Sequence, residues 1–174
     1  MKKNVWVFGS IIGIIFACFM VYATSQCYTN PDFESNDVVG YAGMIAVFSF
    51  IFIGIKNYRD KYNGGVISFG KAFKTGFYIT LIASTIYVSV WLIDYYIFIP
   101  DFLDKYIPHV LKEASRKGAS PVELQDKAAE MAKFKEMYKN PLFVILASFA
   151  EVFPLGLIIA LISALVLKRK ALVK

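Results

Sequence analysis

The stretch LFVILASFAEVFPLGLIIALISALVL, residues 142–167, is almost entirely apolar and decides the fold class. A helix needs about 20 consecutive apolar residues to cross the hydrocarbon core of a bilayer, and this stretch is long enough. Only a helix satisfies its own backbone polar groups in lipid, so we expect a membrane-spanning helix here. Glu151 and Pro154 are the two residues within it that such a helix does not favour.

Three further stretches have the same character. Residues 5–23 and 38–55 carry no charge, and residues 75–99 carry one acid, Asp94. Over the whole chain 57% of the residues are hydrophobic and 18% are charged, whereas a soluble domain has about a quarter charged residues and under about half apolar ones. The sequence therefore predicts an all-α fold, a four-helix transmembrane bundle that forms a single domain over residues 1–174.

Lysine and arginine are distributed unevenly between the two sides of this bundle. The side that holds the N-terminus, residues 56–74 and the tail from Lys168 carries eleven basic residues and one acid, whereas the other side carries eight basic and ten acidic residues. Short basic loops stay in the cytoplasm, so we expect both termini there. The net charge of +6 thus reflects topology, and we expect no nucleic-acid partner.

The first span has an alternative interpretation. The lysines at 2–3, the apolar run and the small residues at 23–25 are also typical of a cleavable signal peptide. The run is longer than the about 7–15 residues of a signal core. Moreover, Gly9, Gly13 and Ala17 lie four residues apart, which would let another helix approach closely. We favour a retained helix; cleavage would leave three spans.

Residues 101–139, between the third and fourth spans, show two amphipathic helical patterns. Ser120-Pro121-Val122-Glu123 is typical of a helix start, with a cap, a proline at the first position and a glutamate that reaches back to the cap. Gly118 is a suitable stop for the helix before it. Apolar residues recur at helical spacing in both helices: Leu103, Ile107, Val110, Leu111 and Ala114, then Leu124, Ala128, Met131, Phe134 and Tyr138. The sequence predicts an outer, extramembrane helical hairpin.

The apolar stripes of this hairpin must be covered by each other, by the bilayer surface or by a protein partner. Mutual packing is the simplest interpretation, and a protein partner is the functional alternative. Pro108 lies within the first of the two helices and should kink or break it.

The inner loop KNYRDKYNGGVISFGKAFK, residues 56–74, combines basic and aromatic side chains. Asn63-Gly64-Gly65 predicts a turn, and Ser68 predicts the cap of the third helix. The basic residues are candidate contacts for anionic lipid headgroups: Lys56, Arg59, Lys61, Lys71 and Lys74. Ordinary orientation charges with an interfacial aromatic belt would explain the same pattern.

Together with YKNPLFVI at residues 138–145 and the basic ending at residues 167–170, this loop resembles a family of small bacterial membrane proteins, domain of unknown function 4199. The likeness extends over nearly the whole chain. It implies a multi-pass protein of the bacterial inner membrane and supports the four-span interpretation. It implies no activity, ligand or catalytic residue.

Glu151 is the residue that is most costly to place in lipid, because no lysine or arginine lies within any span to neutralise it. Tyr87, Trp91 and Asp94 recur on one face of the third span. By depth, Tyr87 and Trp91 bracket Glu151, whereas Asp94 lies about 6 Å nearer the outer surface, where its carboxylate can reach the interface. We therefore predict an intramembrane polar cluster of these four residues, with a hydrogen bond from Tyr87 or Trp91 to Glu151. Pro154 should kink the helix nearby. A protonated structural carboxyl and an ion or proton site are the two interpretations of Glu151.

Two function classes remain. The first is a non-enzymatic accessory or interaction protein that uses the outer hairpin, and the second is a small ion or proton translocator that uses Glu151. We expect no enzyme, cofactor or metal, because no nucleophile–base set or metal-ligand spacing is present in the sequence. Small residues such as Gly54, Gly156 and Ala160 predict close-packing faces, either within one chain or in a homo-oligomer.

Reporter fusions test the predicted topology. A fluorescent-protein reporter joined after the C-terminus is expected to be active, and an alkaline phosphatase reporter joined there is expected to be inactive, because the basic tail keeps that end in the cytoplasm. Fusion within residues 117–120 should give the reverse pattern. An active phosphatase at the C-terminus would show that the charge asymmetry does not set the orientation.

Overall fold

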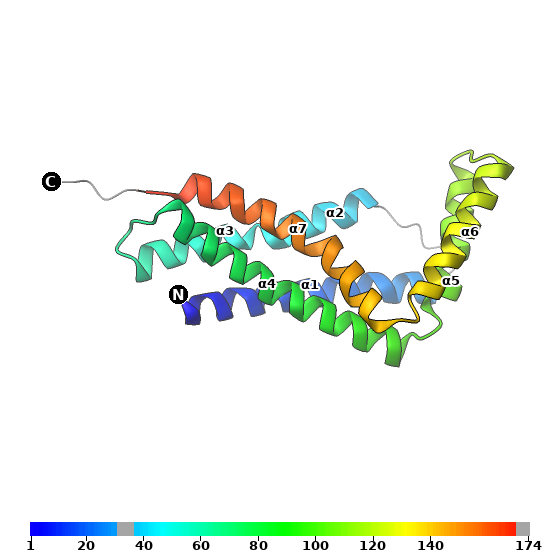
Figure 1. Ribbon diagram of the computed structural model, residues 1–174, viewed down its shortest axis with the longest axis horizontal. Coiled ribbons are helices and arrows are strands. Elements are labelled where there is room, and N and C mark those ends of the chain that lie inside the picture. The colour runs from blue at the N-terminus through cyan, green and yellow to red at the C-terminus, as the bar shows by residue number, and fades with distance from the viewer. Residues whose placement is uncertain (31–36, 170–174) are drawn as a thin grey trace.

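The computed structural model describes residues 1–30 and 37–169, and this part of the chain is almost entirely helical (Figure 1). The elements are α1 (Lys2–Thr29), α2 (Asp37–Phe48), α3 (Phe50–Asn57), the π-helical turn η1 (Tyr58–Tyr62), α4 (Phe69–Ile93), the π-helical turn η2 (Asp94–Phe98), α5 (Phe102–Arg116), α6 (Pro121–Met137) and α7 (Pro141–Leu167). Within the described ranges the only β pairing is an isolated antiparallel bridge between Ile67 and Arg169.

Four helical segments are long and apolar enough to cross a membrane, which confirms the predicted number. They are Lys2–Thr29, Val38–Tyr62, Phe69–Phe98 and Pro141–Leu167. The first segment extends beyond the predicted limits of 5–23 at both ends, the second extends beyond 38–55 at its end, and the third extends beyond 75–99 at its start. Most of the additional residues are polar or charged, and such residues lower the hydropathy of a segment without preventing it from being helical.

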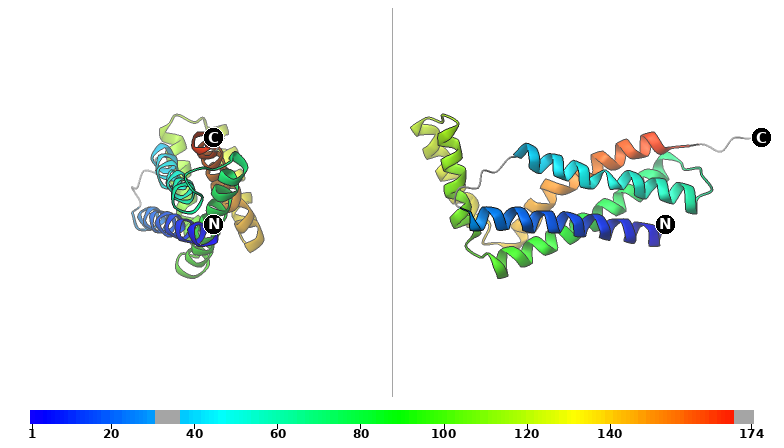
Figure 2. Two further views of the ribbon diagram at one scale, coloured as in Figure 1. Left: turned by 90° about the vertical axis from the view of Figure 1, so that its left-hand side faces the viewer. Right: turned by 180° about the vertical axis from the view of Figure 1, so that it is seen from behind.

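The four segments run antiparallel to their neighbours in the chain, so that the start of α1 and the end of α7 lie at the same end of the molecule (Figures 1 and 2). α4 packs most extensively, against α1 on one side and α7 on the other, and it also contacts α3. The buried residues form one continuous apolar core that includes Ile12, Phe48, Ile79 and Val152. The fold is therefore a helical bundle arranged around α4.

Glycines allow this close packing. A Cβ added to Gly13 of α1 would lie 2.9 Å from the Cβ of Ile86, and one added to Gly76 of α4 would lie 2.8 Å from the Cβ of Ala160. Both distances are too short for a real contact. The predicted small-residue faces of the first and fourth spans thus serve contacts within one chain.

α5 and α6 lie side by side across the end of the bundle opposite to the start of α1 (Figure 1). Ser120 and Glu123 form the predicted capping box, and the backbone hydrogen bond from Ser120 lowers the pKa of the Glu123 carboxyl. Gly118 has the left-handed conformation, with a φ of 88°. Lys135 of α6 also forms an ion pair with Asp104 of α5. The turn chemistry predicted from the sequence is present in the structure.

The two apolar stripes of α5 and α6 are at least partly buried throughout, and none of their ten predicted residues is exposed. The sequence predicts that Pro108 kinks or breaks the helix; the break is wrong, because α5 continues without interruption from Phe102 to Arg116, and the kink stays a prediction. Pro108 is exposed, so its ring is not forced against other helices, and the remaining backbone hydrogen bonds maintain the helix. α7 likewise continues through Pro154.

The close approach of α4 to α7 leads to a testable prediction for Gly76. Gly76→Leu is expected to lower the free energy of unfolding by about 2 kcal/mol or more, because a well-packed contact does not accept a larger side chain. The measurement is thermal unfolding of the purified protein in detergent. Gly70→Leu is the matched control, since Gly70 lies on the same helix with open space around its Cα. Equal losses for the two variants would contradict the close approach.

Candidate functional site

A cleft of about 290 Å³ lies where the bundle meets α5 and α6. Helices α1, α4, α5, α6 and α7 all contribute to its lining, together with the residue that follows α6. Its lining is mostly aromatic, and we call it the aromatic cleft. It is lined by Met20, Thr24, Tyr87, Trp91, Phe102, Leu103, Tyr106, Phe134, Tyr138, Ser148 and Glu151.

The aromatic walls of the cleft are held in place by contacts between rings. Tyr87 stacks on Phe16 of α1 with ring centroids 4.5 Å apart. Trp91 meets Phe102 edge to face at 5.5 Å, and Phe134 packs against Tyr138 at 4.5 Å. Such contacts stabilise beyond the area they bury, so the walls have a defined shape.

The first turn of α5 is tied to the end of α1, and this places α5 over the cleft. The Tyr28 hydroxyl donates a 2.7 Å hydrogen bond to Asp101 Oδ1, which lowers the pKa of the Asp101 carboxyl. Lys105 Nζ lies 3.4 Å from the centroid of the Tyr28 ring. Phe102 and Leu103, between these two contacts, are buried in the core.

Glu151 is the only acidic residue of the cleft lining, and no lysine or arginine lines the cleft. Its side chain is exposed and contributes to the lining of the cleft. The hydrogen bond predicted from Tyr87 or Trp91 is not present, and Glu151 has no ion-pair partner among the described residues. Both aromatic residues nevertheless line the same cleft, so three of the four residues predicted to cluster are brought together.

Tyr138, just after α6, lines the same cleft as Glu151. Burial raises the pKa of Tyr138 to about 12, and the negative charge of Glu151 acts in the same direction. Its hydroxyl is therefore neutral at any physiological pH. The cleft thus offers neutral ring faces and hydroxyls around one carboxyl group.

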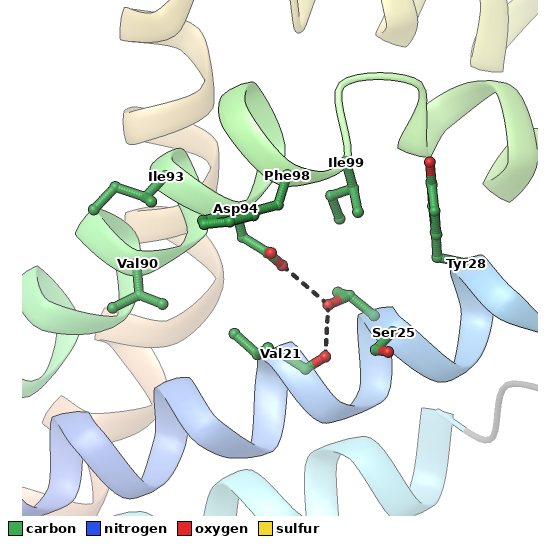
Figure 3. A pocket seen from close by; sticks show the side chains of 9 residues that line it. Val21, Ser25, Tyr28, Val90, Ile93, Asp94, Phe98 and Ile99 are labelled. Atoms are coloured by element: carbon green, nitrogen blue, oxygen red, sulfur yellow. Dashed lines mark hydrogen bonds between the residues drawn. The ribbon is translucent and has the colours of Figure 1, made fainter.

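Asp94, the fourth residue of the predicted cluster, lies in a different cleft of about 390 Å³ between α1 and η2 (Figure 3). There the Thr24 hydroxyl donates to Asp94 Oδ2 at 3.2 Å. Thr24 lines both clefts, so α1 separates the two carboxyl groups. Asp94 is the first residue of η2, which continues α4 three residues after Trp91. The helical spacing gave its position along the third span, but it contained no information on where α1 crosses.

At the opposite end of the bundle, the predicted basic residues do not form one uniform patch. Arg59 pairs with Asp60 through two hydrogen bonds, of 2.6 and 3.2 Å, and donates a third, of 3.4 Å, to the carbonyl of Leu167 at the end of α7. Lys71 donates to Asn63 Oδ1 at 2.6 Å. Lys56, Lys61 and Lys74 are exposed. Arg59 and Lys71 therefore have partners within the protein, and their contact with lipid headgroups, like that of Lys56, Lys61 and Lys74, stays a prediction.

The inner loop itself has the predicted turn and cap. Gly64 and Gly65 have φ values of 65° and 77°, and Ser68 accepts a hydrogen bond from the backbone of Lys71. Beyond the loop, Ile67 and Arg169 exchange two backbone hydrogen bonds, of 3.0 and 2.8 Å. This bridge joins the loop to the segment that follows α7.

The sequence analysis missed a polar contact within the bundle. Asn4 is buried, donates to the carbonyl of Gly54 at 2.9 Å, and accepts from Asn57 at 2.6 Å. The signal in the sequence was an amide at the border of an apolar span, where such a group usually needs a partner. This contact of Asn4 links α1 to α3 and lies far from the aromatic cleft.

These features define the class of protein, a helical bundle with four apolar segments of membrane-spanning length and one carboxyl group in an aromatic cleft. The chain belongs to the family described as "Protein of unknown function (DUF4199)", whose model matches residues 7–169. The resemblance noted in the sequence is thus confirmed over nearly the whole chain. No curated protein and no solved structure gives a match.

Proposed function

We propose that this chain is an integral protein of the bacterial inner membrane that acts by contact rather than by catalysis, as an accessory or interaction protein. Both termini face the cytoplasm in this proposal. α5 and α6 then form an extramembrane hairpin on the outer side, and its outer surface binds a protein partner. The exposed Lys56, Lys61 and Lys74 lie near the anionic headgroups of the inner leaflet.

The observation that carries the proposal is that α6 has local contacts at both of its ends and yet contributes no buried residue. Its N-terminus is fixed by the capping box, and its C-terminal end is tied to α5 through Lys135 and Asp104. The helix extends beyond the side of the bundle (Figure 1). A helix that is held rigidly and left uncovered is suited to presenting a surface to a partner.

The surface that we propose for the partner is the outer face of α6, and it differs from the apolar stripes that the sequence analysis considered. The residues of the apolar stripes of α5 and α6 are all at least partly buried, so the stripes are not the surface that this proposal uses. The opposite face of α6 is exposed and carries small or polar residues, with Val122 68% exposed at its start and Ala129 and Ala132 further along. Small side chains let another helix approach, and the flanking charges would orient it.

A single added charge tests this surface. Ala129→Arg is expected to reduce the amount of partner recovered by crosslinking and purification from native membranes at least about fivefold, because a long charged side chain would separate the two surfaces. The thermal unfolding of the variant should be unchanged, since Ala129 is exposed.

Ser115→Arg adds the same charge on α5 at an exposed position and is the matched control. It should recover as much partner as the unaltered chain. If Ala129→Arg recovers the same proteins in the same amounts, the outer face of α6 is not the contact surface. If the unaltered chain recovers no specific protein, the interaction role itself is contradicted.

Ion or proton translocation through Glu151 is the second candidate function. Glu151 is unpaired in the aromatic cleft, and buried hydroxyls continue from there along α4, at Ser84, Thr80 and Thr75. The Ser84 hydroxyl is buried without a hydrogen-bond partner in the described structure. Such a group costs free energy unless water or an ion visits it.

Glu151→Gln separates the two candidates. In proteoliposomes with an internal pH dye, a translocator should lose about 90% or more of its proton flux on this substitution, because glutamine cannot exchange a proton. Ser89→Ala, which removes an exposed hydroxyl from α4, should retain the flux. Flux that is indistinguishable from that of empty liposomes, with the unaltered chain, would rule the translocation role out.

A further inference from the structure

The aromatic cleft holds a carboxyl group without a protein cation. Glu151 lines the cleft with no lysine or arginine beside it, and it has no ion pair among the described residues. A carboxylate within an apolar span is costly unless a positive charge neutralises it. The cleft thus contains a carboxyl group without a cationic partner, and a positively charged ligand would complete the ion pair.

Six aromatic rings, from three helices and the residue that follows α6, line the same space: Tyr87, Trp91, Phe102, Tyr106, Phe134 and Tyr138. The face of an aromatic ring carries negative electrostatic potential and attracts cations, most strongly for tryptophan. Cages of such rings are the usual way in which proteins recognise quaternary ammonium groups. The ring faces and the Glu151 carboxylate therefore both favour a positively charged ligand.

The polar atoms of the lining argue against a metal ion. A hard divalent cation requires six or more oxygen ligands, and no group of three His, Cys, Asp or Glu residues gathers within the described residues. The lining offers one carboxylate and a few hydroxyls, and the rest is ring carbon and aliphatic carbon. An organic cation needs only the one charge and apolar contact for its carbon atoms.

The size and position of the cleft fit a small amphiphilic cation. Its volume of about 290 Å³ is at the lower end of the roughly 300–1,000 Å³ of ligand sites. It opens at the junction of the bundle with α5 and α6, beside the outer ends of the spans. A ligand with a charged head and an apolar remainder would place the head against Glu151.

We infer that the aromatic cleft binds an organic monocation of the quaternary or tertiary ammonium class, with the Glu151 carboxylate as its counter-ion and the Trp91 and Phe134 side of the ring cage against its alkyl groups. The head is either a free solute or the headgroup of a lipid. This binding role does not depend on the protein contact at α6.

Fluorescence provides a direct measurement, since the chain has two tryptophans. Trp6 is 63% exposed and lies outside the cleft, so the Trp6→Phe variant leaves Trp91 as the only tryptophan reporter. The probe is choline, added to this variant in a neutral maltoside detergent. Its uncharged isostere 3,3-dimethylbutan-1-ol has the same shape without the charge, and equilibrium dialysis of labelled choline gives a second readout.

Choline is expected to change the Trp91 emission saturably, and the uncharged isostere is expected to have no effect at the same concentration. Glu151→Gln should weaken choline binding at least about tenfold, while Glu136→Gln should leave it unchanged. Glu136 is the matched control because its carboxylate pairs with Lys139 on the exposed side of α6. Phe134→Leu should weaken binding several-fold, and it tests the cage if Glu151→Gln does not fold.

The two sources of the cation are distinguished in nanodiscs. One preparation contains phosphatidylcholine and the other contains phosphatidylglycerol. If the Trp91 emission is shifted in the phosphatidylcholine nanodiscs and choline no longer changes it there, the ligand is a lipid headgroup. If choline titrates equally in both, the ligand is a free solute. An equal response to the isostere, unchanged choline binding in Glu151→Gln, or no binding by dialysis would each overturn the inference.

Discussion

The structure depends on the close approach of α4 to α1 and α7. Apolar helices in lipid gain little from the hydrophobic effect on association, so they rely on packing and on small residues that let backbones meet. Gly13 and Gly76 provide two such places, one on each side of α4. Because α4 is fixed by both contacts, the direction of every side chain further along it is fixed as well.

The residues through which α4 contacts its neighbours become larger along the helix. Towards the N-terminal end of α4 the contacts are made by glycine and threonine, and towards its C-terminal end by Tyr87 and Trp91. Glycine lets two helices come close together, whereas large rings keep them apart and occupy the space between them. Phe102 of α5 then packs against the Trp91 ring. The aromatic cleft is therefore a product of residue size along one helix, and Glu151 of α7 is placed in it by the packing of α7 on α4.

Local chemistry was predictable from the sequence, while contacts between distant segments were not. The number of spans, the cap at Ser120 and the left-handed Gly118 follow from composition, hydropathy and turn preferences within a few residues. The separation of Asp94 from Glu151 depends on where α1 crosses α4, and the contact of Arg59 with Leu167 joins residues far apart in the chain. A helical period gives the face on which a side chain lies, but it does not identify the neighbouring helix.

The backbone bridge between Ile67 and Arg169 has a consequence for biosynthesis. Arg169 follows all four spans in the chain, so the ribosome must complete the last span before this bridge can form. Until then the loop around Gly64 lacks its final partner, even though the helices on both sides of it have already been synthesised. The end of the bundle that holds the start of α1 is thus completed last, and early release of the nascent chain would leave that loop open.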